Sequence, residues 1–381
     1  MILLSGPNIS GNEWKYAKEC LDTAWVSSVG SYVSQFENMV AEYAGAKFGV
    51  ATSSGTTALH ISLILSLVER DDYVICPNVT FIATLNSIKY VGANPLLIDV
   101  DADTWQMDLD LLEEFLVEKT EIRDGVCTLK ENGKKIKAIM PVHVLGNICD
   151  MDRLMKITQD YHLLMIEDST EALGSYYKGK HAGSFGKFGC FSFNGNKIIT
   201  CGGGGVIVTD DEALAQKAKH LTTQAKADSF EYYHDEIGYN YRLTNVAAAI
   251  GVGQMEQLPD FVKRKHEIMN FYINNLGGIG DISFQKVNEG INPNWWLFTI
   301  KTKNQKEILK KLNEQKMQSR PFWIPMNQLP MFKNDVYITK NDVSNHIYQH
   351  CLSIPCSTNI KDEDMASICN VIKSCFKPVN I

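Results

Sequence analysis

The stretch FSFNGNKIITCGGGGVIVTDD, residues 191–211, places a lysine between two apolar, strand-like runs. Lys197 follows the run CFSF, and four glycines lead from it into the run VIVT. Burying a free ammonium in such surroundings is costly, so most lysines lie in solvent instead. A lysine in a partly desolvated pocket has a lowered pKa and becomes a nucleophile that can form a Schiff base. Lys197 is therefore a candidate catalytic residue.

The glycines at 202–205 do not form a nucleotide-binding fingerprint. They do not match GxGxxG, and no acidic residue follows at the spacing of a dinucleotide site, which argues against an NAD enzyme. They are not a P-loop either, because the lysine precedes them. Flexible backbone lying close to a cofactor is the better explanation.

Outward from this stretch, short apolar runs alternate with amphipathic helices from about residue 35. The predicted strands are KFGVATSS, DYVICPNVT, NPLLIDVD and HLLMIEDST. Between them lie predicted helices such as TTALHISLILSLV and DLLEEFLVEK. This alternation predicts an α/β fold with a mostly parallel central sheet and flanking helices on both faces.

Two segments interrupt the alternation and suggest how the chain is divided. GVCTLKENGKKIKAIM, residues 125–140, contains Asn132-Gly133, which predicts an inserted β-hairpin near 122–138. After a long predicted helix at 257–276 the elements become shorter, and one of them, FWIP at 322–325, is a predicted strand. We therefore predict a large domain over residues 1–254, which includes an N-terminal segment, and a smaller α+β domain over 255–381.

Composition excludes several classes of protein. The chain is 45% hydrophobic and 21% charged with a net charge of −7, and no basic face or arm indicates nucleic-acid binding. The N-terminus does not resemble a signal peptide, and the longest apolar run, ALHISLILSLV, is too short to cross a membrane. The ten cysteines form no CxxC pair, so we expect no metal site and reduced thiols in a cytoplasmic protein.

Two further motifs accompany Lys197. In SSGTTALH, residues 53–60, a strand runs directly into a helix, and the exposed N–H groups there could bind a phosphate or simply form an ordinary cap. In HLLMIEDSTEALGS, Glu167 and Asp168 end a strand, where a carboxylate could hold a protonated ring nitrogen or cap the next helix. Together, the three elements suit pyridoxal 5′-phosphate.

With these motifs, the chain resembles the fold-type-I aminotransferases of the DegT/DnrJ class, which aminate keto sugars attached to nucleotides. The likeness covers nearly the whole chain and follows the order of the family's motifs, which are SGNEWKYAKECLDTAWVSSVG, SSGTTALH, CPNVTFIAT, IEDSTEALGS, FSFNGNKIIT and GYNYRLTNVAAAIG. The resemblance implies a pyridoxal-phosphate enzyme with L-glutamate as amino donor and C4 of a 4-keto-6-deoxy sugar as acceptor.

The resemblance also implies roles for residues around the cofactor ring. Lys197 would form the Schiff base and later move protons, and Asp168 would pair with the ring nitrogen. Phe81 would stack on the ring, although an aromatic residue at this position could also be part of the core. Glu171 stands where many relatives have a glutamine near the ring hydroxyl. Asn194 replaces a histidine common in the family and is given no role.

The family's phosphate-binding positions correspond here to Gly55, Thr56 and Ser192. Asn240 would reach the phosphate in the neighbouring subunit, which implies a homodimer with shared active sites. Taken alone, Ser192 could be an ordinary strand residue and Asn240 could cap a turn. Arg320 could contact the nucleotide diphosphate or the donor carboxylate.

For the acceptor, the inserted hairpin, DTWQMD, GNICDMD and FNGNKIIT most resemble enzymes that act on UDP-2-acetamido-4-keto sugars, on routes to legionaminic acid or bacillosamine. The alternative is the GDP-linked sugar of perosamine synthases, which share DTWQMD. A hypothesis from another class is a cofactor-binding regulator that has lost catalysis.

Overall fold

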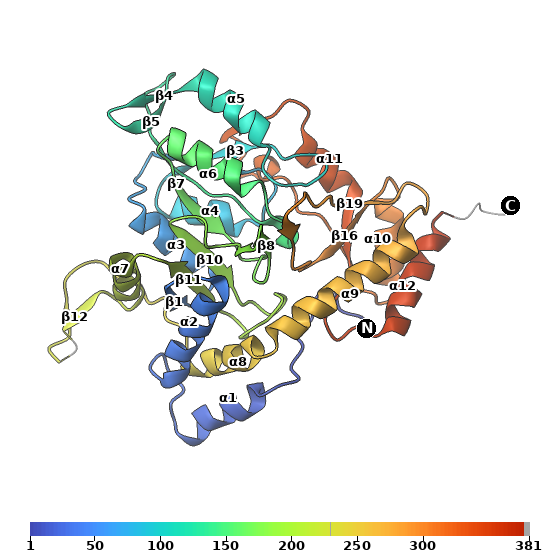
Figure 1. Ribbon diagram of the computed structural model, residues 1–381, viewed down its shortest axis with the longest axis horizontal. Coiled ribbons are helices and arrows are strands. Elements are labelled where there is room, and N and C mark those ends of the chain that lie inside the picture. Colours follow the sequence, from blue (N-terminus) through green and yellow to red (C-terminus); the bar gives the residue numbers. More distant parts are fainter. Residues whose placement is uncertain (229, 377–381) are drawn as a thin grey trace.

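The computed structural model describes residues 1–228 and 230–376 and contains a large sheet of eight strands in the order β1-β11-β10-β7-β6-β2-β3-β18 (Figure 1). The pairings from β10 to β18 are parallel, and the two that join β1, β11 and β10 are antiparallel. This arrangement confirms the mostly parallel sheet. The strands are β1 (Phe48–Thr52), β2 (Tyr73–Pro77), β3 (Asn94–Ile98), β6 (Ile136–Ile139), β7 (Leu164–Asp168), β10 (Phe188–Ser192), β11 (Gly205–Thr209) and β18 (Val336–Ile338).

Helices cover both faces of this sheet because successive strand residues point to opposite sides. In β2, Val74 and Cys76 belong to the core beneath α3, α4 and α7, while Ile75 belongs to the core beneath α5 and α6. The covering helices are α3 (Gly55–Leu65), α4 (Ala83–Tyr90), α7 (Glu212–Thr222), α5 (Leu109–Lys119) and α6 (Met151–Asp160). A third core joins α2 (Ser31–Ala44) and α8 (Asn245–Met255) to the sheet, and α1 (Glu13–Asp22) packs on α8.

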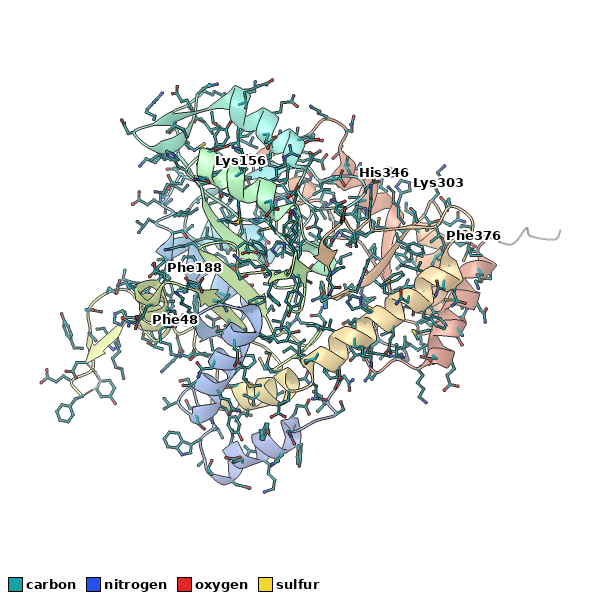
Figure 2. All side chains as sticks on the ribbon, in the orientation of Figure 1. Phe48, Lys156, Phe188, Lys303, His346 and Phe376 are labelled. Atoms are coloured by element: carbon teal, nitrogen blue, oxygen red, sulfur yellow. The ribbon has the colours of Figure 1, made fainter. Side chains whose placement is uncertain are left out.

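Capping side chains define where several of these helices begin. The side chains of Asp108, Asp150, Asp211 and Thr244 each accept a hydrogen bond from the backbone N–H three residues later. Such caps satisfy N–H groups that have no partner inside the helix. Figure 2 shows the division between core and surface: Phe188 lies in the interior at the large sheet, and Lys156 and Lys303 lie at the surface.

The C-terminal part forms a second sheet in the order β14-β16-β19-β17. Its core is shared with the long helix α9, which runs from α8 to this unit (Figure 1). The elements are α9 (Leu258–Leu276), β14 (Ser283–Phe284), β16 (Phe298–Lys301), α10 (Gln305–Glu314), β17 (Arg320–Pro321), α11 (Val343–His350), β19 (Cys351–Ile354) and α12 (Asp362–Ser374). One strand from this part, β18, lies in the large sheet, so the two units are joined along β3.

The predicted strand FWIP is wrong. The strand in this region is β17, and it ends before Phe322. Phe322 is buried against Trp105, with ring centroids 5.6 Å apart, and the chain then turns towards the large sheet. There Met326 donates its backbone N–H to the carbonyl of Asn78 at 3.1 Å. Apolar character here reflects burial between the two units rather than strand pairing.

The inserted hairpin is confirmed in part, because its fully paired part lies one strand earlier in the chain than predicted. It consists of β4 (Thr120–Arg123) and β5 (Val126–Leu129), and its turn is Asp124-Gly125. Both turn residues have positive φ, 52° and 77°, as a tight two-residue hairpin turn requires. Asn132-Gly133 does join two strands, β5 and β6, as predicted. The segments on either side of it form an isolated antiparallel bridge between Thr128 and Lys135, and β6 then pairs within the large sheet.

A short hairpin projects from the body of the molecule. It is formed by β12 (Lys226–Asp228) and β13 (Tyr233–His234) and carries exposed aromatic side chains (Figure 1). The remaining short strands, β8 (Tyr176–Tyr177), β9 (Lys180–His181) and β15 (Ile291–Asn292), form a small sheet of their own. Within the residues described, no helix is long and apolar enough to span a membrane.

Candidate active site

A cavity of about 400 Å³ lies between the large sheet and the C-terminal unit. Its wall includes the first turn of α3, the loop before α4, the loops after β7 and β10, and strand β17. Ligands of α/β proteins collect at the carboxyl ends of parallel strands, which is where this cavity lies. The structure brings most of the predicted site residues to it, namely Gly55, Thr56, Phe81, Glu171, Ser192, Lys197 and Arg320.

Lys197 lies in the loop between β10 and β11, and its side chain is 11% exposed. Its Nζ is 3.8 Å from Glu171 Oε1. Burial lowers the pKa of the Lys197 amine, and the charges of Glu171 and Asp168 oppose this effect only in part. The lysine therefore has the buried, activated character that its place between two apolar runs predicts.

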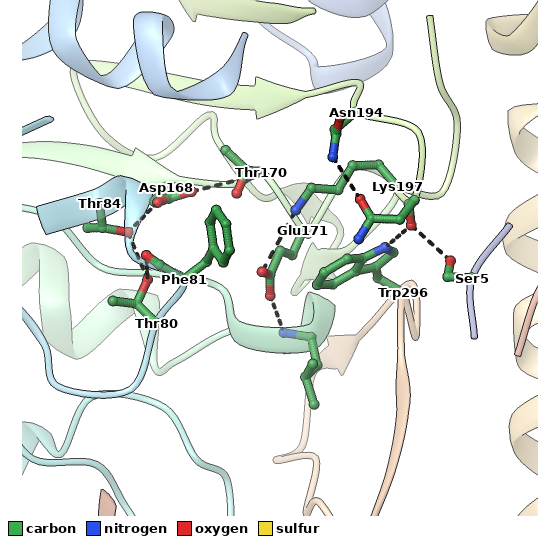
Figure 3. A network of polar contacts seen from close by, with 12 residues as sticks. Ser5, Thr80, Phe81, Thr84, Asp168, Thr170, Glu171, Asn194, Lys197 and Trp296 are labelled. Atoms are coloured by element: carbon green, nitrogen blue, oxygen red, sulfur yellow. Dashed lines mark hydrogen bonds and ion pairs between the residues drawn. The ribbon is translucent and has the colours of Figure 1, made fainter. Parts of the chain in front are cut away.

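Glu171 is the carboxylate nearest to that amine. Its Oε2 accepts a hydrogen bond from the backbone N–H of Leu145 at 2.8 Å (Figure 3). Burial raises the pKa of Glu171 to about 7, although the charge of Lys197 acts in the opposite direction. Glu171 can therefore carry a proton near neutral pH beside the Lys197 amine.

The two acidic residues that end β7 have different environments. Glu167 is buried and accepts hydrogen bonds from His143 Nε2 at 2.9 Å and from the backbone N–H groups of Gly183, Phe185 and Gly186. Burial alone would raise the pKa of Glu167, but these hydrogen bonds lower it. Glu167 is therefore a structural clamp on the loop before β10.

Asp168, in contrast, contacts the segments that line the cavity. It is 3% exposed, and its Oδ2 accepts a hydrogen bond from Thr84 Oγ1 at 2.7 Å (Figure 3). Its Oδ1 accepts a longer one from the backbone N–H of Thr170 at 3.3 Å. Thr170 itself lines the cavity. Neutral donors therefore fix the Asp168 carboxylate in place, and its charge can pair with a positively charged group.

The turn before α3 caps the helix and also lines the cavity. Ser54 caps the helix in a capping box with Thr57, while Gly55 and Thr56 line the cavity. The N–H groups of a first helical turn have no partner inside the helix and attract anions. A Cβ added at Gly55 would lie 2.8 Å from the Cβ of Ser192, so glycine lets the helix approach β10 closely.

This close approach gives a testable prediction. We expect Gly55→Ala to separate α3 from β10 and to weaken binding of pyridoxal phosphate by about tenfold or more, as overpacking typically costs 1–3 kcal/mol. Equilibrium dialysis of the cofactor measures the loss. Gly195→Ala is the matched control, because a Cβ there would meet nothing within 4 Å. Equal affinities for the two variants would contradict the assignment.

Phe81 is 53% exposed and lines the cavity, so the alternative that it is a core residue is wrong. Ser192 is a strand residue paired with Gly205 and also lines the cavity. The sequence analysis missed Thr84 and Trp296. Thr84 lies in the quoted motif CPNVTFIAT, three residues after Phe81. Trp296 is about a hundred residues from Lys197 in sequence, and its ring centroid lies 4.0 Å from Lys197 Nζ.

Asn240 does not reach the cavity of its own chain. It is exposed near the projecting hairpin, and its Oδ1 accepts a hydrogen bond from Arg242 Nη2 at 3.1 Å. Its predicted contact with the phosphate of a neighbouring subunit stays a prediction. Asn194, which replaces the family's histidine, lines the cavity and donates to Asn196 Oδ1 at 3.2 Å.

The residues present fit pyridoxal phosphate. Lys197 offers an amine for an aldehyde, Asp168 a carboxylate for a ring nitrogen, and Phe81 an exposed ring face. The first turn of α3 with Ser192 offers a cradle for a phosphate, which a Cβ at Gly55 would fill.

Comparison with known proteins gives consistent results. The sequence profile of the DegT/DnrJ/EryC1/StrS aminotransferase family matches residues 7–373. GDP-perosamine synthase from Escherichia coli O157:H7 is 36% identical over 373 residues, which cover 97% of each chain. GDP-perosamine synthase from Caulobacter vibrioides is 37% identical over 337 residues, 87% of this chain and 86% of that one.

A solved structure supports the fold. The PLP-form of a candidate sugar aminotransferase from Streptococcus pneumoniae matches this structure with a TM-score of 0.87 at 25% identity, covering 98% of each chain. The predicted fold class of the fold-type-I aminotransferases is thereby confirmed.

Proposed function

Because the chain belongs to the DegT/DnrJ/EryC1/StrS aminotransferase family, we propose that it is a pyridoxal-phosphate-dependent aminotransferase acting on a nucleotide-linked 4-keto sugar. The observation that carries the proposal is the environment of Lys197. Its buried amine lies 3.8 Å from the Glu171 carboxylate in a cavity that also contains Phe81 and the first turn of α3. These are the groups that such a cofactor needs around it.

When bound, pyridoxal phosphate supplies an electron sink for breaking the Cα–H bond of an amino donor, which we propose to be L-glutamate. The amine of Lys197 would take the proton from the donor's Cα and return one later in the reaction. Asp168 would pair with the ring nitrogen and keep it protonated, and Thr84 fixes Asp168 through its 2.7 Å hydrogen bond. Glu171 accepts or returns a proton beside the Lys197 amine.

Over the whole cycle, the amino group of L-glutamate would pass to C4 of the sugar in exchange for the keto oxygen, and 2-oxoglutarate would leave. In the second half, Lys197 would move the proton in the opposite direction. Arg320 lines the cavity and presents a guanidinium that can bind a diphosphate with two parallel hydrogen bonds. The two GDP-perosamine synthases among the relatives support a GDP-linked 4-keto-6-deoxy sugar. They favour this alternative over the UDP-2-acetamido sugar that the hairpin and DTWQMD first suggested.

A substrate panel tests this proposal. We expect the protein incubated with pyridoxal phosphate, L-glutamate and GDP-4-keto-6-deoxymannose to give the 4-amino sugar, detected by mass. UDP-2-acetamido-4-keto sugars and dTDP-4-keto sugars should react at least about tenfold more slowly in kcat/KM, since a base mismatch leaves polar groups unpaired. A preference for the UDP sugar would restore the first interpretation. If glutamate left the absorption of the bound cofactor unchanged, a binding regulator would be the better hypothesis.

We also propose that the enzyme acts as a cytoplasmic homodimer. The support is a set of exposed apolar side chains that a monomer rarely shows to solvent. They lie on the projecting hairpin and on the N-terminal segment, and comprise Phe230, Tyr232, Tyr233, Ile237, Trp14 and Trp25. Asn240 is exposed in the segment after that hairpin, which suits a contact with a second subunit. Sedimentation at twice the chain mass of 42.7 kDa would agree with this proposal, and sedimentation as a monomer would refute it.

A further inference from the structure

Trp296 contacts both ends of the Lys197 residue. Its ring centroid lies 4.0 Å from Lys197 Nζ, and its Nε1 donates a hydrogen bond to the backbone carbonyl of Asn196 at 2.7 Å (Figure 3). The same carbonyl accepts a hydrogen bond from Ser5 Oγ at 2.8 Å. One indole therefore fixes the backbone immediately before the lysine and meets the amine at the end of its side chain.

Trp296 is itself held firmly. It is 3% exposed, its backbone N–H donates to Asn294 Oδ1 at 2.9 Å, and its carbonyl accepts a hydrogen bond from the buried Lys265 Nζ at 2.7 Å. The side-chain amide of Asn294 also donates to the backbone carbonyl of Glu171 at 2.9 Å. One buried amide thus joins the segment that carries the ring to the segment that carries the carboxylate.

The amine of Lys197 consequently has two fixed neighbours, an indole face and the carboxylate of Glu171. An ammonium is attracted to both, and the attraction to the ring is stronger where water is excluded. A lysine side chain has a flexible four-carbon stem, so without such neighbours the free amine would adopt several rotamers. The ring face limits that choice.

We infer that Trp296 is a positioning residue, which keeps the amine of Lys197 beside Glu171 whenever that amine is not bonded to the cofactor. The inference rests on the proposed function for the role of Lys197, and it goes beyond that function by assigning the holding of the free amine to one aromatic face. The ring face holds the amine, and the Nε1–H fixes the backbone carbonyl of Asn196 next to the lysine.

The first test uses the cofactor-free protein. The amine of Lys197 is labelled with acetic anhydride at pH 7, and the rate is measured by peptide mass relative to the exposed Lys187. We expect Trp296→Leu to raise the relative rate about tenfold, since the ammonium loses the ring that favours it. Trp296→Phe keeps a ring face and should stay within about threefold of the wild type.

Trp323→Leu is the matched control, because it removes an indole from the same cavity that packs on Phe322 instead, with ring centroids 5.1 Å apart. Its labelling rate at Lys197 should stay within about twofold of the wild type. An unchanged rate in Trp296→Leu, or an equal rise in Trp323→Leu, would overturn the inference. Trp296→Met has a flexible, unbranched side chain that can fill an irregular gap, and it replaces Trp296→Leu should the latter not fold.

The second test uses the enzyme with pyridoxal phosphate. Trp296→Leu should lower kcat about tenfold or more while the KM for the sugar stays within about threefold, and Trp296→Phe should recover most of kcat. A rise in KM alone would mean that Trp296 binds substrate, which would overturn the inference. An absence of amino transfer in the wild type would refute the proposed function, whereas the labelling result would stand.

Discussion

Lys197→Ala is expected to lower kcat for amino transfer by about 10⁴-fold, the upper range for removing a proton-transferring group. The variant loses the buried amine that lies 3.8 Å from Glu171 and that reaches into the cavity. Pre-steady-state mixing with L-glutamate, followed through the absorption of the cofactor, separates the first half of the reaction from the second. We expect both halves to be slow, because we propose that the same amine moves the proton in each.

The fold of Lys197→Ala should be retained. Removing one partner from a buried ion pair usually destabilises a protein, because the other charge is left alone. Here Glu171 can take up a proton instead, since burial raises its pKa to about 7. Lys187→Ala is the control; its exposed ammonium pairs with Asp211 at 2.8 Å, so activity should stay within about twofold of the wild type. More than about a hundredth of wild-type activity in Lys197→Ala would remove this lysine from the proton transfers.

The parallel part of the fold was predictable from local patterns. Runs such as LMIED and YVICP are buried on both faces, and an Asp, Ser or Thr caps α3, α5, α6, α7 and α8 in the structure. The predicted hairpin turn shows the limit of this approach. Asp124-Gly125 and Asn132-Gly133 are both hairpin signals, and only the pairing of β6 within the large sheet decides which one closes the inserted hairpin.

The site was predictable where it consists of motif residues and not where it depends on packing between distant segments. Lys197, Gly55 and Phe81 stand in the motifs FSFNGNKIIT, SSGTTALH and CPNVTFIAT, on which the resemblance rests. Trp296 reaches Lys197 from the C-terminal unit, and an apolar residue in NWWLF gives no indication in the sequence of what it contacts. Similarly, Glu167 and Asp168 are adjacent in sequence, and only the loop before β10 shows that Glu167 is the structural one.

Asp168 is a buried carboxylate whose hydrogen-bond donors, Thr84 Oγ1 and the backbone N–H of Thr170, are neutral. Among residues 1–228 and 230–376, no basic side chain lies within ion-pair distance of it. Buried charges are normally paired, so this arrangement is costly for the protein alone. A positively charged ring nitrogen in the adjoining cavity would supply the missing partner. Burying this charge lowers the free energy of unfolding of the cofactor-free protein, as is common for residues that have a function.

Asp168→Asn tests this interpretation. The amide has nearly the same shape and can still accept a hydrogen bond from Thr84, but it carries no charge to keep a proton on the ring nitrogen. We expect kcat to fall about 10³-fold, as for other losses of a fixed electrostatic group, while the free energy of unfolding of the cofactor-free protein stays equal or rises. Chemical denaturation and steady-state kinetics measure the two effects.

Glu167 is the control, because we expect its substitution to lower stability strongly and kcat only a little. In Glu167→Gln, an amide N–H₂ must face backbone N–H groups that now donate to a carboxylate, so we expect a loss of about 2–3 kcal/mol in the free energy of unfolding. Its kcat, measured at a temperature where it is folded, should fall far less than that of Asp168→Asn. If Asp168→Asn kept kcat within about tenfold of the wild type, or lost as much stability as Glu167→Gln, the charge of Asp168 would have a structural role and the ring nitrogen would need another partner.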